Sequence, residues 1–410
     1  MSTDTPLRVA VFDADAPPAL AVTRSLGRAG VEVEVFTPHR GSVAGLSRHA
    51  RRERLCPPLG DASRFVPWLD DALRSGDIEL IVPTTDLMTY YISTVREHLP
   101  ASALHALPEH DAILDALFKD RFHRACLAVG QLVPWQKAPV STDDALDGAG
   151  DYPYPLIVKP RSHVVVPLAR GTVVAGPTEL RAAFAPFPVA PGQRDLVERH
   201  PEQRWPVLQA YVPGALAHLF SISGVLGGDD AALATSLCQK TSQWPPTLGV
   251  GTVFHSLDDP DLLAQGTRLA RRMLGRGLFE LELILDSGGR ALAVDLNPRA
   301  FGQISLNLRR GHDLPLLWYR QSCGLAIEAA TAPRAGVSWR HALPYHIDQG
   351  LQLWHAPDRL AQLTRYLHEV GTPHVDIVND LRDPVPSLVF TVKMLRHPRA
   401  LVRSLRRSTT

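Results

Sequence analysis

The first third of the chain alternates between the hydrophobic patterns of strands and of helices. Short runs rich in β-branched residues at 7–12 and 78–82 predict buried parallel strands, and residues 31–36 alternate with period two. Residues 19–29 and 65–74 instead repeat their apolar side chains at helical spacing. This β-α-β-α-β order predicts a small open parallel sheet with helices on both faces.

The turn after the first strand argues against dinucleotide binding. Residues 13–18 read DADAPP and contain no GxGxxG. Two carboxylates therefore stand where backbone amides would have to cradle a pyrophosphate. We interpret residues 1–115 as a supporting or substrate-side domain.

The middle of the chain, residues 116–327, has longer strands and hairpins. Residues 155–159 and 207–212 are strongly apolar, and a Gly-Gly-Asp-Asp turn divides a hairpin over 219–238. A helix is expected over 259–274, because Asp followed by Pro suits the N-cap and the first helical position. This region forms the second predicted domain.

The segment 278–299, LFELELILDSGGRALAVDLNPR, predicts an acidic hairpin. Period-two alternation places Glu280 and Glu282 on one face of the first strand. On the second strand it groups the small and polar positions on one face and the apolar ones on the other: Ala291, Ala293, Asp295 and Asn297 against Leu292, Val294 and Leu296. A four-residue loop then sets Glu282 opposite Asp295 and Glu280 opposite Asn297.

Two carboxylates directly opposite each other repel, and a bound cation would offset that repulsion. The oxygens of Glu282, Asp295 and Asn297 suit Mg²⁺ held together with phosphate groups. Small alanines beside them would leave room, and Arg299 is placed to meet a phosphate or a carboxylate. The alternative is a half-exposed hairpin whose outer face simply carries charge, and spacing alone leaves both interpretations open.

The hairpin resembles the metal-binding end of the ATP-grasp superfamily, in which a Glu is followed by EINPR. Here the pattern stands as Glu282, then DLNPR at 295–299. Five further segments resemble family segments in the same order: FKDRF at 118–122, YPLIVKP at 154–160, LQAYVPG at 208–214, KTSQWPPTLGVGT at 240–252 and NPRAFGQ at 297–303. The resemblance implies an α/β chain with an N-terminal domain before a two-lobed α+β ATP-binding domain.

The resemblance also implies roles for individual residues. Lys119 and Lys159 would neutralise the phosphates of ATP, and the segment containing Gln209, Tyr211 and Val212 would line the adenine. Glu282, Asp295 and Asn297 would hold one or two Mg²⁺ ions, for which Mn²⁺ would substitute. Lys240 and Arg299 would stabilise charge on the transferring phosphoryl group and on an acyl phosphate.

The sequence departs from the family pattern at three places. Asp295 replaces the usual Glu and has a shorter stem. The loop over 161–171 has one glycine where relatives have a glycine-rich flap, so phosphate contacts there would come from Arg161, His163 or Arg170. The usual ribose-binding Glu has no counterpart near Leu216 and His218, and that role stays unassigned.

The function implied is an ATP-dependent carboxylate–amine ligase that forms an amide bond through an acyl phosphate. Two alternatives stay open: a kinase or carboxylase on the same fold, and a degenerate nucleotide-binding module without turnover. The substrates would be small carboxylates and amines, such as amino acids or a small peptide. A homodimer is expected by analogy only.

Composition limits the number of domains, the kinds of partner and the cellular location that we expect. The chain has 410 residues, enough for two or three domains, and its formal net charge of +1 favours neither nucleic acid nor a membrane as partner. The four cysteines form no CxxC pair, so neither a disulfide framework nor a zinc site is expected. The N-terminus lacks the pattern of a signal peptide, and we expect a cytoplasmic protein.

The final segment, residues 328–410, contains no motif that indicates a chemistry. It ends in a basic amphipathic stretch whose cations lie among Leu and Val: Lys393, Arg396, Arg399, Arg403, Arg406 and Arg407. Such a stretch can contact an anionic surface. A solvated terminal helix is the more common outcome, and it is what we expect here.

Overall fold

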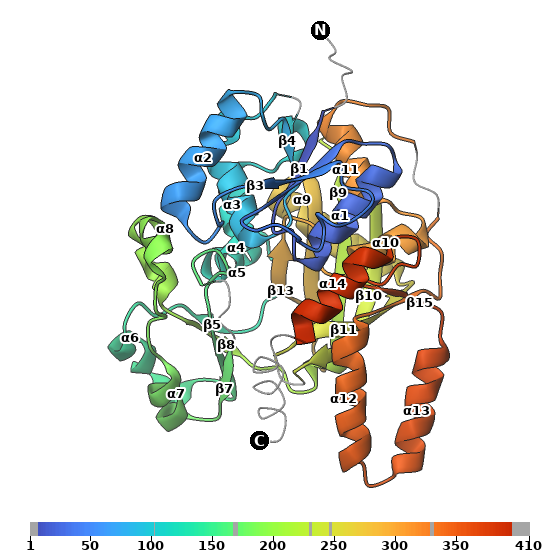
Figure 1. The fold of residues 1–410 in the computed structure, drawn as a ribbon. Helices are drawn as coiled ribbons and strands as arrows, with labels where there is room; N and C mark the ends of the chain where they lie inside the picture. The colour runs from blue at the N-terminus through green and yellow to red at the C-terminus, as the bar shows by residue number, and fades with distance from the viewer. Residues whose placement is uncertain are drawn as a thin grey trace.

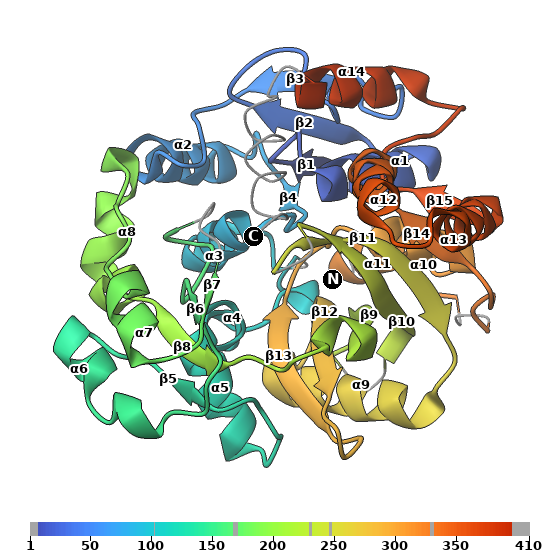
Figure 2. The ribbon, with the colours of Figure 1, turned by 90° about the horizontal axis from the view of Figure 1, so that it is seen from below.

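The computed structural model describes residues 7–101, 103–166, 171–228, 232–245, 248–328 and 332–395. Three sheets lie around a common centre, and helices cover their outer sides (Figures 1 and 2). None of the helices in the described ranges has the length and hydropathy needed to span a bilayer.

The N-terminal sheet has the order β3-β2-β1-β4, and all its strands are parallel. Its strands are β1 (Val9–Val11), β2 (Val33–Thr37), β3 (Arg52–Leu55) and β4 (Leu80–Ile81). The connecting helices are α1 (Pro17–Arg28), α2 (Ala62–Arg74) and α3 (Asp86–Thr94). The predicted open parallel sheet is confirmed, while the short edge strand β3 was not expected from the sequence.

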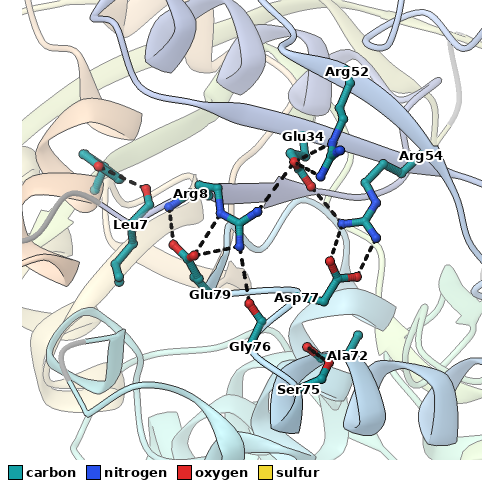
Figure 3. A network of polar contacts seen from close by, with 11 residues as sticks. Leu7, Arg8, Glu34, Arg52, Arg54, Ala72, Ser75, Gly76, Asp77 and Glu79 are labelled. Atoms are coloured by element: carbon teal, nitrogen blue, oxygen red, sulfur yellow. Dashed lines mark hydrogen bonds and ion pairs between the residues drawn. The ribbon is translucent and has the colours of Figure 1, made fainter.

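Charged side chains on this sheet pair with one another (Figure 3). Glu34 on β2 is only 5% exposed, and Arg52 and Arg54 of β3 contact its carboxylate at 2.6 and 3.0 Å. Arg54 also donates to Asp77 at 2.8 Å. A carboxylate can be buried here because cations of the neighbouring strand compensate its charge. These residues therefore have a structural role.

The second sheet is small and antiparallel, with the order β5-β8-β6-β7. Its strands are β5 (Gln136–Lys137), β6 (Leu156–Lys159), β7 (Thr172–Val174) and β8 (Val207–Ala210). The helices before it and around it are α4 (His110–Leu117), α5 (Lys119–Ala128), α6 (Thr142–Leu146), α7 (Pro177–Ala183) and α8 (Arg194–Arg199).

The third sheet has seven strands in the order β13-β12-β9-β10-β11-β14-β15. They are β9 (Leu219–Leu226), β10 (Ala232–Trp244), β11 (Val250–Leu257), β12 (Gly277–Leu285), β13 (Ala291–Asn297), β14 (Ser338–Arg340) and β15 (His374–Asp376). Helix α9 (Pro260–Leu274) packs its apolar face on this sheet; Asp259 caps it by accepting from the Leu262 amide at 3.0 Å. The expected helix start is confirmed.

The chain after the acidic hairpin packs against the N-terminal sheet. Helices α10 (Ile304–Arg310) and α11 (Leu314–Ser322) share its hydrophobic core, and the Trp318 indole donates to the Ala106 carbonyl at 3.0 Å. Helices α12 (Ala342–His355) and α13 (Arg359–Gly371) project as a hairpin (Figures 1 and 2). Asp383, directly before α14 (Pro384–Leu395), pairs with Arg24 of α1 at 2.9 Å. The five arginines predicted for the basic tail lie outside the described residues.

Candidate active site

The acidic hairpin formed by β12 and β13 has the predicted register at its carboxylates. Glu282 lies opposite Asp295, and Glu280 lies opposite Asn297. Leu281 and Leu283, on the other face of β12, are buried in the core beneath α9. The polar face therefore points away from that core, as the alternation of β12 predicts.

The register nearer the turn differs from the prediction by one residue. Leu285, not Asp286, pairs with Ala291, and a β-bulge lies between Glu282 and Leu283, where Val294 is the extra residue on β13. The extra residue on β13 reverses its alternation, because the side-chain period is two. Ala291 and Ala293 are consequently buried in the core with Leu296. The expectation that these alanines lie beside Asp295, with Leu292 and Val294 on the apolar face, is wrong.

Two lysines from different elements lie close to the carboxylates. Lys119, the first residue of α5, places its Nζ atom 2.8 Å from Oδ1 of Asp295. Burial opposes the charged form of both side chains, but their mutual attraction outweighs it, so the pKa of Asp295 is lowered and that of Lys119 is raised. The candidate metal ligand and the candidate phosphate ligand thus form an ion pair with each other.

Lys159, at the end of β6, forms no ion pair with any of the described residues. Its Nζ donates to Oε1 of Gln209 at 2.8 Å, and the Gln209 amide donates in turn to Gln136 at 3.3 Å. Burial, followed by the positive charge of Lys119, lowers the pKa of Lys159 to about 7. A lysine whose partner is a neutral amide can bind a polyanion favourably, since the anion would supply the negative charge that compensates the buried ammonium group.

Arg299 connects the hairpin to the N-terminal domain. Its Nε forms a short ion pair with Asp86, at the start of α3, and its Nη2 donates to Oδ1 of Asn297 at 2.8 Å. Burial lowers the pKa of Arg299, but the Asp86 carboxylate more than compensates and the pKa is raised. Asp86 follows the last strand of a parallel sheet, at the edge where ligands bind in open α/β folds. Asp86 was not predicted as a site residue, although its position shortly after a predicted strand could have indicated it.

Glu280 is the centre of a buried polar network. Ser221 donates to its Oε1 at 2.7 Å, Gln303 makes a shorter contact to the same oxygen, and Asn297 donates to Oε2 at 3.2 Å. Burial, and then the nearby charge of Glu282, raise the pKa of Glu280 to about 7. Asn297 donates to Glu280 and accepts from Arg299, so these two side chains fix its position.

Because folding raises the pKa of Glu280, the protonated form stabilises the native state at low pH, and this stability is lost as the pH rises through about 7. We expect Glu280→Gln to remove that loss in metal-free buffer. Relative to wild type, its free energy of unfolding should rise by on the order of 2–3 kcal/mol between pH 5 and pH 8. Urea unfolding at several pH values measures this, and parallel profiles for the two proteins would contradict it.

The segment expected to line the adenine follows β8. Gln209 is buried, and the Tyr211 amide donates to the Pro155 carbonyl at 2.9 Å, so it has a partner within the protein. The Val212 amide has no hydrogen-bond partner among the residues that the structure describes. Of these two backbone donors, Val212 is therefore the one free to contact a ligand.

Lys240 lies on the same face of the large sheet as the carboxylates. Cys238 pairs with Ser221, Ser221 with Glu282, and Lys240 stands two residues after Cys238 on β10. Its side chain is 9% exposed, and within the described ranges it has no ion pair. Seven of the ten predicted site residues thus lie on two sheets and on α5 between them, and Tyr211, Val212 and Arg299 lie directly after β8 and β13, with Lys240 two strands away from Glu282.

Arg161, in the loop after β6, has a structural role and not the phosphate-binding role expected from the sequence. The Arg161 side chain is 2% exposed and donates to the carbonyls of Trp205 and Pro139 at 2.9 and 2.5 Å and to the Asp120 carboxylate at 3.2 Å. With these partners its guanidinium is not available to a phosphate. His163, whose Nδ1 has no partner in the described part of the chain, is the better candidate, and Arg170 lies outside the described residues.

We expect Arg161→Met to lower the free energy of unfolding by about 3 kcal/mol, because it leaves Asp120 buried without its cation. The matched control is Arg124→Met on the exposed side of α5, which should change little. Denaturant unfolding monitored by circular dichroism measures both. Equal stabilities for the two variants would show that the Arg161–Asp120 pair is not structural.

The carboxylate face fits a magnesium ion better than a metal such as zinc. No three His, Cys, Asp or Glu side chains come together as a metal site within the described ranges. Mg²⁺ needs only one or two carboxylates when phosphate oxygens complete its coordination. Glu282 has no hydrogen-bond donor among the described residues, so its oxygens are free for a cation.

Comparison with known proteins defines the fold. No family model and no curated protein matches this sequence. Among solved structures, N5-carboxyaminoimidazole ribonucleotide synthetase in complex with ADP is similar, with a TM-score of 0.62, 11% identity, and coverage of 85% of this chain and 84% of that one. Biotin carboxylase from Campylobacter jejuni, a βγ-ATP complex, gives a TM-score of 0.61 at 13% identity over 81% and 74%.

L-amino acid ligase from Bacillus licheniformis is also similar, with a TM-score of 0.57, 16% identity, and coverage of 77% and 74%. All three are ATP-grasp enzymes, and this chain has the ATP-grasp fold. The predicted fold class is confirmed. At these identities the likeness is one of fold.

Proposed function

We propose that this protein is an ATP-dependent carboxylate–amine ligase. The observation that carries the proposal is the pairing of opposite charges across the site. Two carboxylates of the β12–β13 hairpin face two lysines, one from α5 and one from β6, and Asp295 contacts Lys119 directly. Such an arrangement suits Mg²⁺-ATP, because the carboxylates would bind the Mg²⁺ ion and the lysines would bind the phosphates.

The reaction would proceed in two steps. The substrate carboxylate attacks the γ-phosphorus of ATP, giving an acyl phosphate and ADP, and an amine then attacks the acyl carbon and releases phosphate. Phosphoryl transfer depends on positioning and charge neutralisation more than on a protein nucleophile. Mg²⁺, when bound by Glu282, Asp295 and Asn297, would supply Lewis-acid stabilisation of phosphate charge.

The protein's own groups would bind ATP and stabilise the charge of the transferring phosphoryl group. Lys159, which has no ion pair among the described residues, would pair with a phosphate, and the Val212 amide would hydrogen-bond the adenine edge. Arg299 would stabilise negative charge on the transferring group while Asp86 keeps its guanidinium in place. Lys240 would approach the same group from β10.

A carboxylase is the second candidate, because biotin carboxylases are among the similar structures. In that case bicarbonate would take the place of the organic acid. The difference between the two lies in the carboxylate substrate, so one assay separates them.

The test is release of ADP and phosphate from Mg²⁺-ATP with amino acids, other acids and bicarbonate supplied singly and in pairs. A ligase gives turnover only with a particular acid and amine, and a product whose mass is their sum less water. Turnover that requires bicarbonate supports the carboxylase. Binding of ATP without turnover under any combination would contradict both and indicate a degenerate nucleotide-binding module.

A further inference from the structure

Asp13, in the turn directly after β1, has a carboxylate without a cation beside it. Its side chain accepts a short hydrogen bond from the Thr85 hydroxyl, and it forms no ion pair with any residue that the structure describes. Asp15, two residues later, contacts Nζ of Lys393 at 2.7 Å and Nε2 of His39 at 3.1 Å. Of the two carboxylates in this turn, that of Asp13 is therefore the one left for a cationic ligand.

Asp13 lies at the point of the N-terminal sheet where open α/β folds bind their ligands. In the order β3-β2-β1-β4, the chain leaves β1 toward β2 on one side and later adds β4 on the other side of β1. Ligands of such sheets bind beyond the carboxyl ends of the two strands that flank this switch. Asp13 follows β1 and Thr85 follows β4, and the Thr84 hydroxyl joins the two strand ends by donating to the Phe12 carbonyl at 3.3 Å.

This switch point adjoins the candidate active site through Arg299. Asp86, the residue after Thr85, forms the ion pair with Arg299, and the Ala300 amide donates to the Pro83 carbonyl at 2.9 Å. Burial raises the pKa of Asp13, while the Thr85 hydroxyl and the charge of Arg299 oppose this effect. A carboxylate and a guanidinium thus act on the same small region, one from the N-terminal sheet and one from the hairpin.

A substrate with both charges matches this pair of groups. In the proposed reaction the substrate carboxylate must reach the γ-phosphorus, where Arg299 would stabilise negative charge. An ammonium group on the same molecule could then donate to Asp13, which would compensate its buried charge. A metal ion fits less well, because no three His, Cys, Asp or Glu side chains come together as a metal site within the described ranges.

We propose, on the basis of the proposed function, that the acid activated by this protein is an amino acid and that Asp13 binds its ammonium group. Thr85 keeps the Asp13 carboxylate in place. A carboxylate beside an ammonium group favours the protonated form, which is not a nucleophile. Asp13 therefore also determines the order of the product: the amine that attacks the acyl phosphate comes from the second substrate.

The experiment measures activation of the acid alone, with hydroxylamine in place of the second substrate. Hydroxylamine attacks an acyl phosphate to give a hydroxamate and phosphate. The full-length chain is incubated with Mg²⁺-ATP and single amino acids, each compared with the acid that lacks the amino group, such as alanine with propionate and leucine with isocaproate. We expect hydroxamate from one or more amino acids, and a kcat/KM lower by about 10²-fold or more for the matching acid.

Two variants test Asp13 itself. Asp13 has a φ of +51°, a left-handed conformation that Asn also tolerates, so Asp13→Asn should keep the turn. We expect it to raise the KM for the amino acid by about tenfold or more and to leave the KM for ATP unchanged. Asp15→Asn is the matched control and should keep both values, because the partners of Asp15 lie within the protein. Circular dichroism checks that each variant is folded.

The possible results separate this inference from the proposed function. Equal activation of amino acids and of their matching acids would overturn the inference and leave the ligase standing. A wild-type KM for the amino acid in Asp13→Asn would overturn the role of Asp13. ADP release that requires bicarbonate would indicate the carboxylase and overturn the inference as well. If the wild-type chain activates no acid at all, the ligase itself is contradicted, and this inference with it.

Discussion

Asp295→Asn is expected to lower Mg²⁺-dependent turnover of ATP by about 10²-fold or more while the chain stays folded. The substitution keeps the shape of the side chain but removes one of the two carboxylates that face each other across the hairpin. It also removes the counter-charge of Lys119, so a modest loss of stability accompanies the loss of activity. Steady-state ADP release across a range of Mg²⁺ concentrations measures the effect.

Two further variants separate metal binding from stability. Glu282→Gln should show the same loss of activity without loss of stability, because no described side chain donates a hydrogen bond to Glu282. Asp286→Asn, at the turn of the same hairpin, is the matched control and should keep wild-type activity. Wild-type turnover in Asp295→Asn or Glu282→Gln would rule out these residues as ligands.

Lys159→Met is expected to raise the KM for ATP by about tenfold or more and to raise the free energy of unfolding by about 1 kcal/mol. The two effects have one cause: the ammonium group is desolvated, and within the described ranges its side-chain partner is the neutral amide of Gln209 until a phosphate binds. An apolar side chain of similar length removes the desolvation cost together with the binding contact. Substrate titration and thermal unfolding of the same preparation measure both.

Lys137→Met in the same lobe is the matched control. Lys137 contacts the Asp144 carboxylate and the Tyr152 hydroxyl, and its pKa is raised, so its loss should destabilise the fold and leave the KM unchanged. In wild type, phosphate binding should draw a proton onto Lys159 above pH 7, so the KM for ATP should rise with pH there. A KM that stays constant between pH 6 and pH 9 would contradict this assignment.

The parts of the site that sequence could predict are those set by local periodicity. Alternation along β12 fixes which face carries Glu280 and Glu282. The pairing of Glu282 with Asp295 was predicted from a four-residue loop, but the loop is one residue longer, and the bulge on β13 restores that pairing. The open parallel sheet followed from the order of its short apolar runs. In each case the evidence lies within a few residues of the element that it predicts.

The rest depends on contacts between residues far apart in the chain. Arg161 lies in a loop that suggested phosphate binding, and only the approach of Asp120 and two carbonyls shows that its donors are occupied. Asp86 reaches Arg299 across 213 positions of sequence. The bulge at Val294, opposite the step from Glu282 to Leu283, leaves no mark in the hydrophobic pattern, because alanines and valines suit either face of a strand.

The bulge on β13 limits how this hairpin can be combined with segments of other proteins in a chimera. One additional residue between the turn and Asp295 determines whether the carboxylate faces the lysines or the core beneath α9. Side chains of β13 before Asp295 can therefore be exchanged for others of similar size, whereas deletion of Val294 would turn Asp295 inward. In a graft from another ATP-grasp protein, the number of residues on this strand matters more than their identity.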